Sequence, residues 1–142
     1  MPASLHVGVP DVATATDAVT GWPLWVLRVE GMVLLIAALA TYVTALDQPF
    51  WLVPLLLFAP DLFMAGYARS SRIGAHLYNL AHSYPLPAVV GASALAGSQE
   101  LWQAAALIWF AHIGLDRALG YGLKYDDSFQ HTHLGWIGKR TD

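Results

Sequence analysis

The sequence contains no cysteine and few charged residues. Without thiolates, disulfides, cysteine metal ligands and cysteine nucleophiles are excluded, so any metal site would use nitrogen and oxygen ligands. Charged residues make up 12% of the 142 residues, whereas 56% are apolar. An ordinary soluble domain has about 25% charged residues. Lipid is the simplest solvent for so apolar a chain, and the composition predicts a membrane protein.

Basic residues are scarce and scattered. The net charge is −3 and Lys and Arg form no run, which argues against nucleic-acid binding.

The first 24 residues contain neither Lys nor Arg, so they lack the basic segment of a cleavable signal peptide, and we expect no cleavage. We expect a mobile tail over residues 1–22, because no hydrophobic period is sustained there, and a single membrane domain over 23–142.

Long apolar runs dominate the rest of the chain. Four windows approach the ~20 residues that a helix needs to cross ~30 Å of hydrocarbon. They cover residues 25–46, 50–68, 74–96 and 100–119. The third window contains Pro85 and Pro87, and we expect a kink there because each proline removes a backbone donor. The sequence predicts an all-α fold, an integral membrane four-helix bundle of up-down topology.

The positions of the basic residues predict the orientation of the chain in the membrane. With four spans, the N-terminus, the second loop and the tail over 120–142 share one side, and all seven basic residues fall there. They are Arg28, Arg69, Arg72, Arg117, Lys124, Lys139 and Arg140. The positive-inside rule then places both termini in the cytoplasm. We therefore expect a multi-pass protein of the inner (cytoplasmic) membrane, with its short cytoplasmic tail folded against the bundle.

Polar side chains gather at similar depth in the cytoplasmic half of this arrangement. They are Glu30, Asp61, His76, Asn79, His82, His112, Asp116 and Arg117. An ionised group in hydrocarbon costs at least ~2.5–3.5 kcal/mol, so such groups normally face the bundle interior and pair with one another. His112 and Asp116 are four residues apart and share a helix face. The sequence predicts a shared polar pocket.

Two interpretations of this cluster stay open. In the first, the cluster is a structural network in which Asp61 or Glu30 neutralises Arg117 and the histidines donate to carbonyl groups. In the second, the histidines and carboxylates bind a divalent metal or perform general acid–base chemistry. His131 and His133 in the tail could face the same way on an extended segment and add two ligands, although a surface turn would suit them equally.

The polar residues also form a pattern along the chain. It comprises Arg28 and Glu30, Pro60 and Asp61, Gly66 and Tyr67, Gly74, Tyr78, Asn79 and His82, His112, Asp116 and Arg117, Gly120 to Tyr125, Phe129, and His131 to Gly135. From about residue 26 to residue 139 the chain resembles an uncharacterised bacterial membrane family, the domain of unknown function 4260. The resemblance implies a small multi-span protein without an established activity. It also implies that the tail, with His131 and His133, belongs to the site.

Our first hypothesis is a cytoplasm-facing, metal-dependent membrane enzyme that acts on a lipid or another hydrophobic substrate. Membrane-embedded metal hydrolases use comparable mixed His/Asp sets, which is an analogy only. The catalytic candidates are Asp61, His82, His112 and Asp116. The metal candidates are the same four with His131 and His133. The substrate-binding candidates are Glu30, Tyr78, Asn79, Arg117, Tyr121 and Tyr125.

The second hypothesis is a non-catalytic binding or accessory protein. It would hold a pigment, a quinone-like ring or a lipid, or dock to a larger membrane complex, and its polar cluster would be structural. An ion carrier ranks last, because the outer half of the predicted bundle has almost no polar residues along a pathway. Four spans bury few residues fully, which is compatible with a homo-oligomer.

Overall fold

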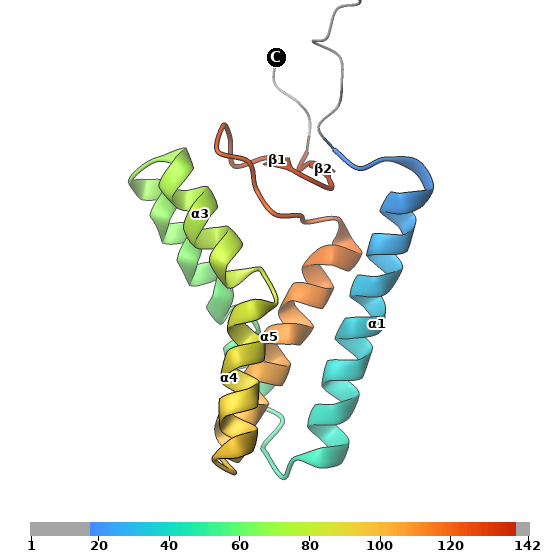
Figure 1. Ribbon diagram of the computed structural model, residues 1–142, viewed down its shortest axis with the longest axis vertical. Coiled ribbons are helices and arrows are strands. Elements are labelled where there is room, and N and C mark those ends of the chain that lie inside the picture. The colour runs from blue at the N-terminus through green and yellow to red at the C-terminus, as the bar shows by residue number, and fades with distance from the viewer. Residues whose placement is uncertain (1–17, 139–142) are drawn as a thin grey trace, which may run out of the picture.

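The computed structural model describes residues 18–138, so most of the tail expected at the N-terminus lies outside the described residues. The described chain is mostly helical, which confirms the predicted helical class (Figure 1). Its helices are α1 (Gly21–Ala45), α2 (Leu52–Leu57), the 3₁₀ helix η2 (Ala59–Ala68), α3 (Ser71–Ala81), α4 (Pro85–Ala96) and α5 (Glu100–Leu119). A hairpin of β1 (His131–Thr132) and β2 (Gly135–Trp136) was not expected.

The helices are arranged around α5. α1 packs along α5, α4 and α2 also contact α5, and η2 packs mainly on α3. Figure 1 shows the tail and its hairpin at one end, together with the start of α1 and the turn between η2 and α3. The loop after α1 and the turn between α4 and α5 lie at the opposite end. The tail therefore covers the end at which α3 and α5 diverge.

α1 has the character of a membrane-crossing helix. Its 25 residues rise about 37 Å at 1.5 Å each, more than the ~30 Å of a bilayer core. Among residues 18–138 it is the one helix that is both long and apolar enough to cross a membrane. The apolar stretch Leu52–Ala68 is shorter.

The predicted kink in the third window is a complete break between α3 and α4. α3 ends at Ala81 and α4 begins at Pro85, where a missing backbone donor costs nothing. The carbonyl groups freed at the break receive side-chain donors from α5. Trp109 Nε1 donates to the carbonyl of Ala81 at 2.6 Å, and Arg117 Nη2 donates to that of His82 at 3.1 Å.

The second window also differs from the uniform helix that we expected. It begins as α2 and continues as the ten-residue 3₁₀ helix η2, which carries Pro60 in its first turn. A 3₁₀ helix has three residues per turn, so side chains three apart eclipse one another. Asp61, Met64 and Tyr67 consequently form one row along η2, in line with Phe58 just before it. This row faces the site described below.

The contact between α1 and α5 depends on two glycines. A Cβ on Gly114 would lie 2.7 Å from the carbonyl oxygen of Gly31 and 2.7 Å from the amide nitrogen of Leu35. A Cβ on Gly31 would lie 2.5 Å from that of Arg117. The two helix backbones therefore touch, as small residues allow in helix pairs within lipid. This contact fixes α5, which carries two of the candidate site residues.

Candidate metal centre

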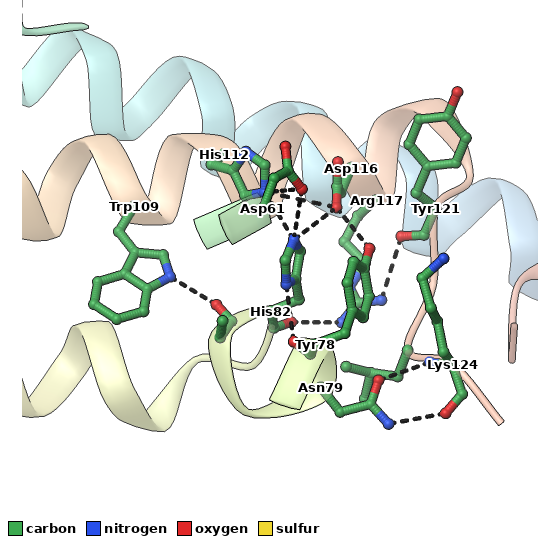
Figure 2. A network of polar contacts seen from close by, with 12 residues as sticks. Asp61, Tyr78, Asn79, His82, Trp109, His112, Asp116, Arg117, Tyr121 and Lys124 are labelled. Carbon is green, nitrogen blue, oxygen red and sulfur yellow. Dashed lines mark hydrogen bonds and ion pairs between the residues drawn. The ribbon is translucent and has the colours of Figure 1, made fainter. Parts of the chain in front are cut away.

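Four of the predicted site residues converge from three helices. Asp61 comes from η2, His82 from the end of α3, and His112 and Asp116 from α5 (Figure 2). His82 Nε2 lies 2.9 Å from His112 Nε2, 3.2 Å from Asp61 Oδ1 and 3.6 Å from Asp116 Oδ2. His112 Nε2 lies 3.7 Å from Asp61 Oδ1 and 3.8 Å from Asp116 Oδ2. Each of the two imidazole nitrogens thus lies within 3.8 Å of an oxygen of both carboxylates.

These spacings fit a tetrahedral cation site. Zinc binds nitrogen and oxygen ligands at ~2.0–2.2 Å, so ligand atoms at the corners of its tetrahedron lie roughly 3.3–3.6 Å apart. The five separations given above run from 2.9 Å to 3.8 Å. Asp61, His82 and His112 alone offer one ligand atom each within 4.8 Å of one another. Small movements of these three side chains would bring their ligand atoms to bonding distance, and Asp116 Oδ2 lies within 3.8 Å of both imidazole nitrogens.

His82 is oriented as a metal-binding histidine usually is. Its Nδ1 lies 2.8 Å from the carbonyl oxygen of Tyr78, which can only accept, so Nδ1 carries the proton and Nε2 presents a lone pair to the cluster. The Tyr78 ring stacks on the imidazole with centroids 3.6 Å apart. The same tyrosine donates its hydroxyl to Asp116 Oδ2 at 3.0 Å. Tyr78 therefore holds two of the four candidate ligands.

The contact between His112 and His82 requires a proton or a cation between the two rings. His112 Nε2 faces His82 Nε2 at 2.9 Å, and two lone pairs cannot approach so closely without a proton or a cation between them. His112 Nδ1 is buried and has no hydrogen-bond partner among the described residues. A proton would make the cluster a structural network, whereas a cation would make it a metal site. Both interpretations from the sequence are therefore still open.

A cleft of about 320 Å³ adjoins the cluster. Its polar wall is formed by Asp61, Tyr78, His112, Asp116, Tyr121 and Lys124. Its apolar wall is formed by Phe58, Met64, Leu115, Leu119, Phe129 and Ile137. Phe58, Asp61 and Met64 belong to the row that η2 aligns, and the α5 residues repeat at helical spacing along one face. A small molecule in this cleft would contact the carboxylates and one imidazole directly.

The tail closes one side of the cleft through a pair of hydrogen bonds. The backbone amide of Lys124 donates to Asn79 Oδ1 at 2.7 Å, and Asn79 Nδ2 donates to the carbonyl of Lys124 at 2.8 Å. Asn79 thus uses its whole amide on the backbone of the tail. We predicted substrate binding for Asn79, and the structure instead gives it a docking role.

Replacing Asn79 with Ala should release the tail from α3. Both hydrogen bonds would be lost, and docking should weaken by about 1–3 kcal/mol. Hydrogen exchange at the Lys124 amide should accelerate in the variant. A Gln48→Ala variant, which removes a contact with Glu100 at the opposite end, should leave that exchange unchanged. Equal protection of the Lys124 amide in both variants would contradict the docking role.

Lys124 is the site residue that the sequence did not reveal. Its ammonium donates to the carbonyl of Phe129 at 2.8 Å and lies 3.4 Å from the centroid of that ring and 4.6 Å from that of Tyr78. The side chain is 4% exposed. Burial lowers the pKa of Lys124 to about 8, although the charges of Asp116 and Asp61 act in the opposite direction. The sequence analysis used Lys124 as a marker of orientation and as part of the family pattern over Gly120 to Tyr125, and assigned it no role in the site.

His131 and His133 do not join the cluster, which corrects their predicted place in the ligand set. His131 Nδ1 lies 2.7 Å from Asp127 Oδ2, and its ring stacks on Trp136. His133 Nδ1 accepts a hydrogen bond from the amide of Leu123 at 2.8 Å. Their spacing of two predicted a common direction on an extended segment. The chain turns between β1 and β2 at His133, so the two imidazoles point apart.

The remaining predicted residues lie in three places. Arg117 is buried and donates to the carbonyls of His82 and Tyr121, so it closes the helix break, and its predicted role toward an anionic group stays a prediction. Tyr121 lines the cleft, whereas Tyr125 lies against the ring of His131 in the tail. Glu30 is exposed on α1 beside the tryptophans at its start and does not line the cleft.

The contact between His133 and Leu123 should make tail docking sensitive to pH. Burial, together with the charge of Arg117, lowers the pKa of His133 below its unfolded value of ~6.5. The unfolded chain therefore binds more protons, and stability should fall as the pH drops below that value. The thermal midpoint should decrease more between pH 7.5 and 5.5 in the wild type than in His133→Asn, which keeps a neutral acceptor. An identical decrease in both proteins would contradict this role.

The fold and the cluster define a class: a mostly helical protein with buried His and Asp side chains converging beside a cleft at one end. The chain belongs to the family described as a domain of unknown function (DUF4260), which matches residues 25–137. The resemblance predicted from the sequence is confirmed. No curated protein and no solved structure matches the chain significantly. The matched range includes all four residues of the cluster, Lys124 and the hairpin.

Proposed function

We propose that this protein is a small multi-pass membrane protein that binds a divalent metal ion through Asp61, His82, His112 and Asp116 and uses it to hydrolyse a hydrophobic substrate. The observation that carries the proposal is the convergence of two imidazole nitrogens and two carboxylate oxygens beside a cleft. Nitrogen and oxygen ligands in this number suit zinc. The orientation of His82 by a backbone carbonyl adds support.

The proposal includes four membrane spans with both termini in the cytoplasm. Trp25, Val29, Val33 and Ile36 on α1 are 58% to 61% exposed, and lipid would cover such a surface. The described basic residues lie at the start of α1, around the turn between η2 and α3, at the end of α5 and in the tail, which are segments at one end of the molecule. The positive-inside rule makes that end cytoplasmic.

Each residue of the cluster then has a chemical task. A divalent ion held by these residues would lower the pKa of a bound water to ~7. Four protein ligands fill a tetrahedral site, so one of them has to leave the ion before water can bind. Asp61 is the more accessible carboxylate, with 28% of its side chain exposed against 14% for Asp116, and we assign it this role: it would leave the ion, admit the water and accept its proton. The water oxygen would bond to the acyl or phosphoryl centre, the bond to the departing oxygen would break, and the proton would pass from Asp61 to that oxygen. Tyr78 holds Asp116 in place.

A hydrophobic-ligand protein without catalysis is the alternative, and a second cleft favours it. A cleft of about 460 Å³ lies between α1, α4 and α5 toward the opposite end, and its lining is mainly apolar, with small residues such as Ala88, Gly91 and Ala92 on the α4 side. The mutual hydrogen bonds of the cluster would then serve stability alone. In this case the protein would hold a lipid or a ring-shaped ligand in the second cleft.

Hydrolysis of a probe ester tests the proposal. Zinc-loaded protein in maltoside micelles should release p-nitrophenol from p-nitrophenyl decanoate, and chelator-treated protein should not. Asp61→Asn should reduce the rate by at least ~100-fold, whereas Asp47→Asn, at an exposed carboxylate outside the cleft, should not change it. If the protein bound zinc stably but hydrolysed neither carboxylic nor phosphoric esters, the enzyme proposal would be overturned and the binding-protein alternative would remain.

A further inference from the structure

The ammonium of Lys124 is buried without a carboxylate partner. No Asp or Glu oxygen of residues 18–138 lies within 4.0 Å of its nitrogen, and its hydrogen bond goes to the neutral carbonyl of Phe129. The rings of Phe129, Tyr78 and Tyr67 surround it. Aromatic faces reduce the cost of burying a cation but leave its charge uncompensated. An ammonium has three donors, so further bonds can be made.

Once a metal is bound, the nearby carboxylates no longer compensate the positive charge of Lys124. The carboxylates of Asp61 and Asp116 carry the two negative charges that a divalent cation requires. The ammonium of Lys124 is then one excess positive charge on the cleft wall. The buried guanidinium of Arg117 lies outside the cleft lining, where its bonds go to the neutral carbonyls of His82 and Tyr121. His82, His112 and Tyr78 are neutral in this arrangement. A negatively charged ligand would compensate the excess positive charge in the cleft.

The cleft wall is also apolar beside these charges. Phe58 and Met64 flank Asp61 on the η2 side, and Leu115 and Leu119 flank Asp116 on α5. Figure 2 shows Lys124 entering from the tail on the opposite side of Tyr78 from His82. A ligand of the cleft would therefore contact both charged groups and hydrocarbon.

We propose, on the basis of the metal site proposed above, that the cleft binds a single-chain amphiphile with an anionic head. The head lies between the ammonium of Lys124 and the cation held by Asp61, His82, His112 and Asp116, and the chain lies along Phe58, Met64, Leu115 and Leu119. Lys124 recognises the charge of the substrate, and the tail that carries it is part of the binding site. The tail thus selects which hydrophobic molecules reach the metal.

Dodecylphosphonate in dodecyl maltoside is a suitable probe, since it contains the sole phosphorus of the sample. Titration followed by ³¹P NMR should show saturable binding to the zinc-loaded wild type. Lys124→Met should weaken binding by at least about tenfold, because the charge partner of the head is removed. Lys124→Arg should retain binding within about threefold. Arg72→Gln, which removes an exposed cation that pairs with Asp126, should bind like the wild type.

The outcomes separate this inference from the function on which it rests. Absence of bound zinc would overturn the metal site itself. Zinc-loaded Lys124→Met that binds the phosphonate as tightly as the wild type would overturn the role of Lys124 and leave the metal site standing. Methylphosphonate or inorganic phosphate binding as tightly as dodecylphosphonate would overturn the amphiphile and indicate a free anion. Lys124→Gln provides a second charge-removing variant, and zinc stoichiometry reports whether each variant is folded.

Discussion

His112→Gln should lose its metal almost completely. One of four ligands disappears, and the buried His82 imidazole is left facing a side chain that cannot replace it. The loss in zinc affinity should exceed the ~10–100-fold that changes in outer hydrogen-bond partners cause. Elemental analysis of the dialysed, detergent-purified protein should give about one zinc per wild-type chain and almost none in the variant.

His76→Gln is the matched control for this experiment. His76 belongs to the same helix as the ligand His82, but it is exposed and lies 3.8 Å from Asp126 in the tail. Its loss should leave the metal content at the wild-type level. Equal metal content in the wild type, His112→Gln and His76→Gln would indicate adventitious binding and would favour the structural network.

Gly114→Ala should destabilise the protein strongly. The new Cβ would meet two backbone atoms of α1 at 2.7 Å, and backbone cannot rotate away as a side chain can. Overpacking of this kind costs about 1–3 kcal/mol and occasionally more. The expected loss should be visible as a lower midpoint of denaturation in mixed micelles.

Gly91→Ala in α4 provides the comparison. Its Cβ would meet only the methyl group of Ala106, at 3.3 Å, and alanine favours the helix by up to ~1 kcal/mol. The stability of this variant should remain close to that of the wild type. If Gly114→Ala were equally stable, the close approach of α1 and α5 would be wrong.

The sequence predicted the helices and the central cluster because both depend on local spacing and on the cost of burying charge. Windows of apolar residues located the helices, and four polar residues at the same predicted depth converge in the structure. Asp61, one of the residues of the predicted pocket, lies 3.2 Å from His82. The position of each polar residue along its predicted helix was sufficient to predict that these side chains meet.

Features that depend on irregular backbone could not be predicted in the same way. The 3₁₀ geometry of η2 rotates Asp61, Met64 and Tyr67 into one row, whereas an α-helix would spread them around its surface. The turn between β1 and β2 separates His131 from His133, although their spacing of two suggested a shared direction. Lys124 is buried by contacts with distant rings, and no local pattern distinguishes it from an exposed lysine.

X-ray absorption spectroscopy of the zinc-loaded protein tests the metal site most directly. The first shell should contain four nitrogen or oxygen atoms at ~2.0–2.2 Å, and two of them should show the multiple scattering of imidazole rings. The imidazole signal should fall to one ring in His82→Gln samples loaded with excess zinc. A shell of six oxygen atoms without imidazole scattering, or a protein that retains no zinc, would contradict the metal centre and leave the His and Asp side chains as a structural network.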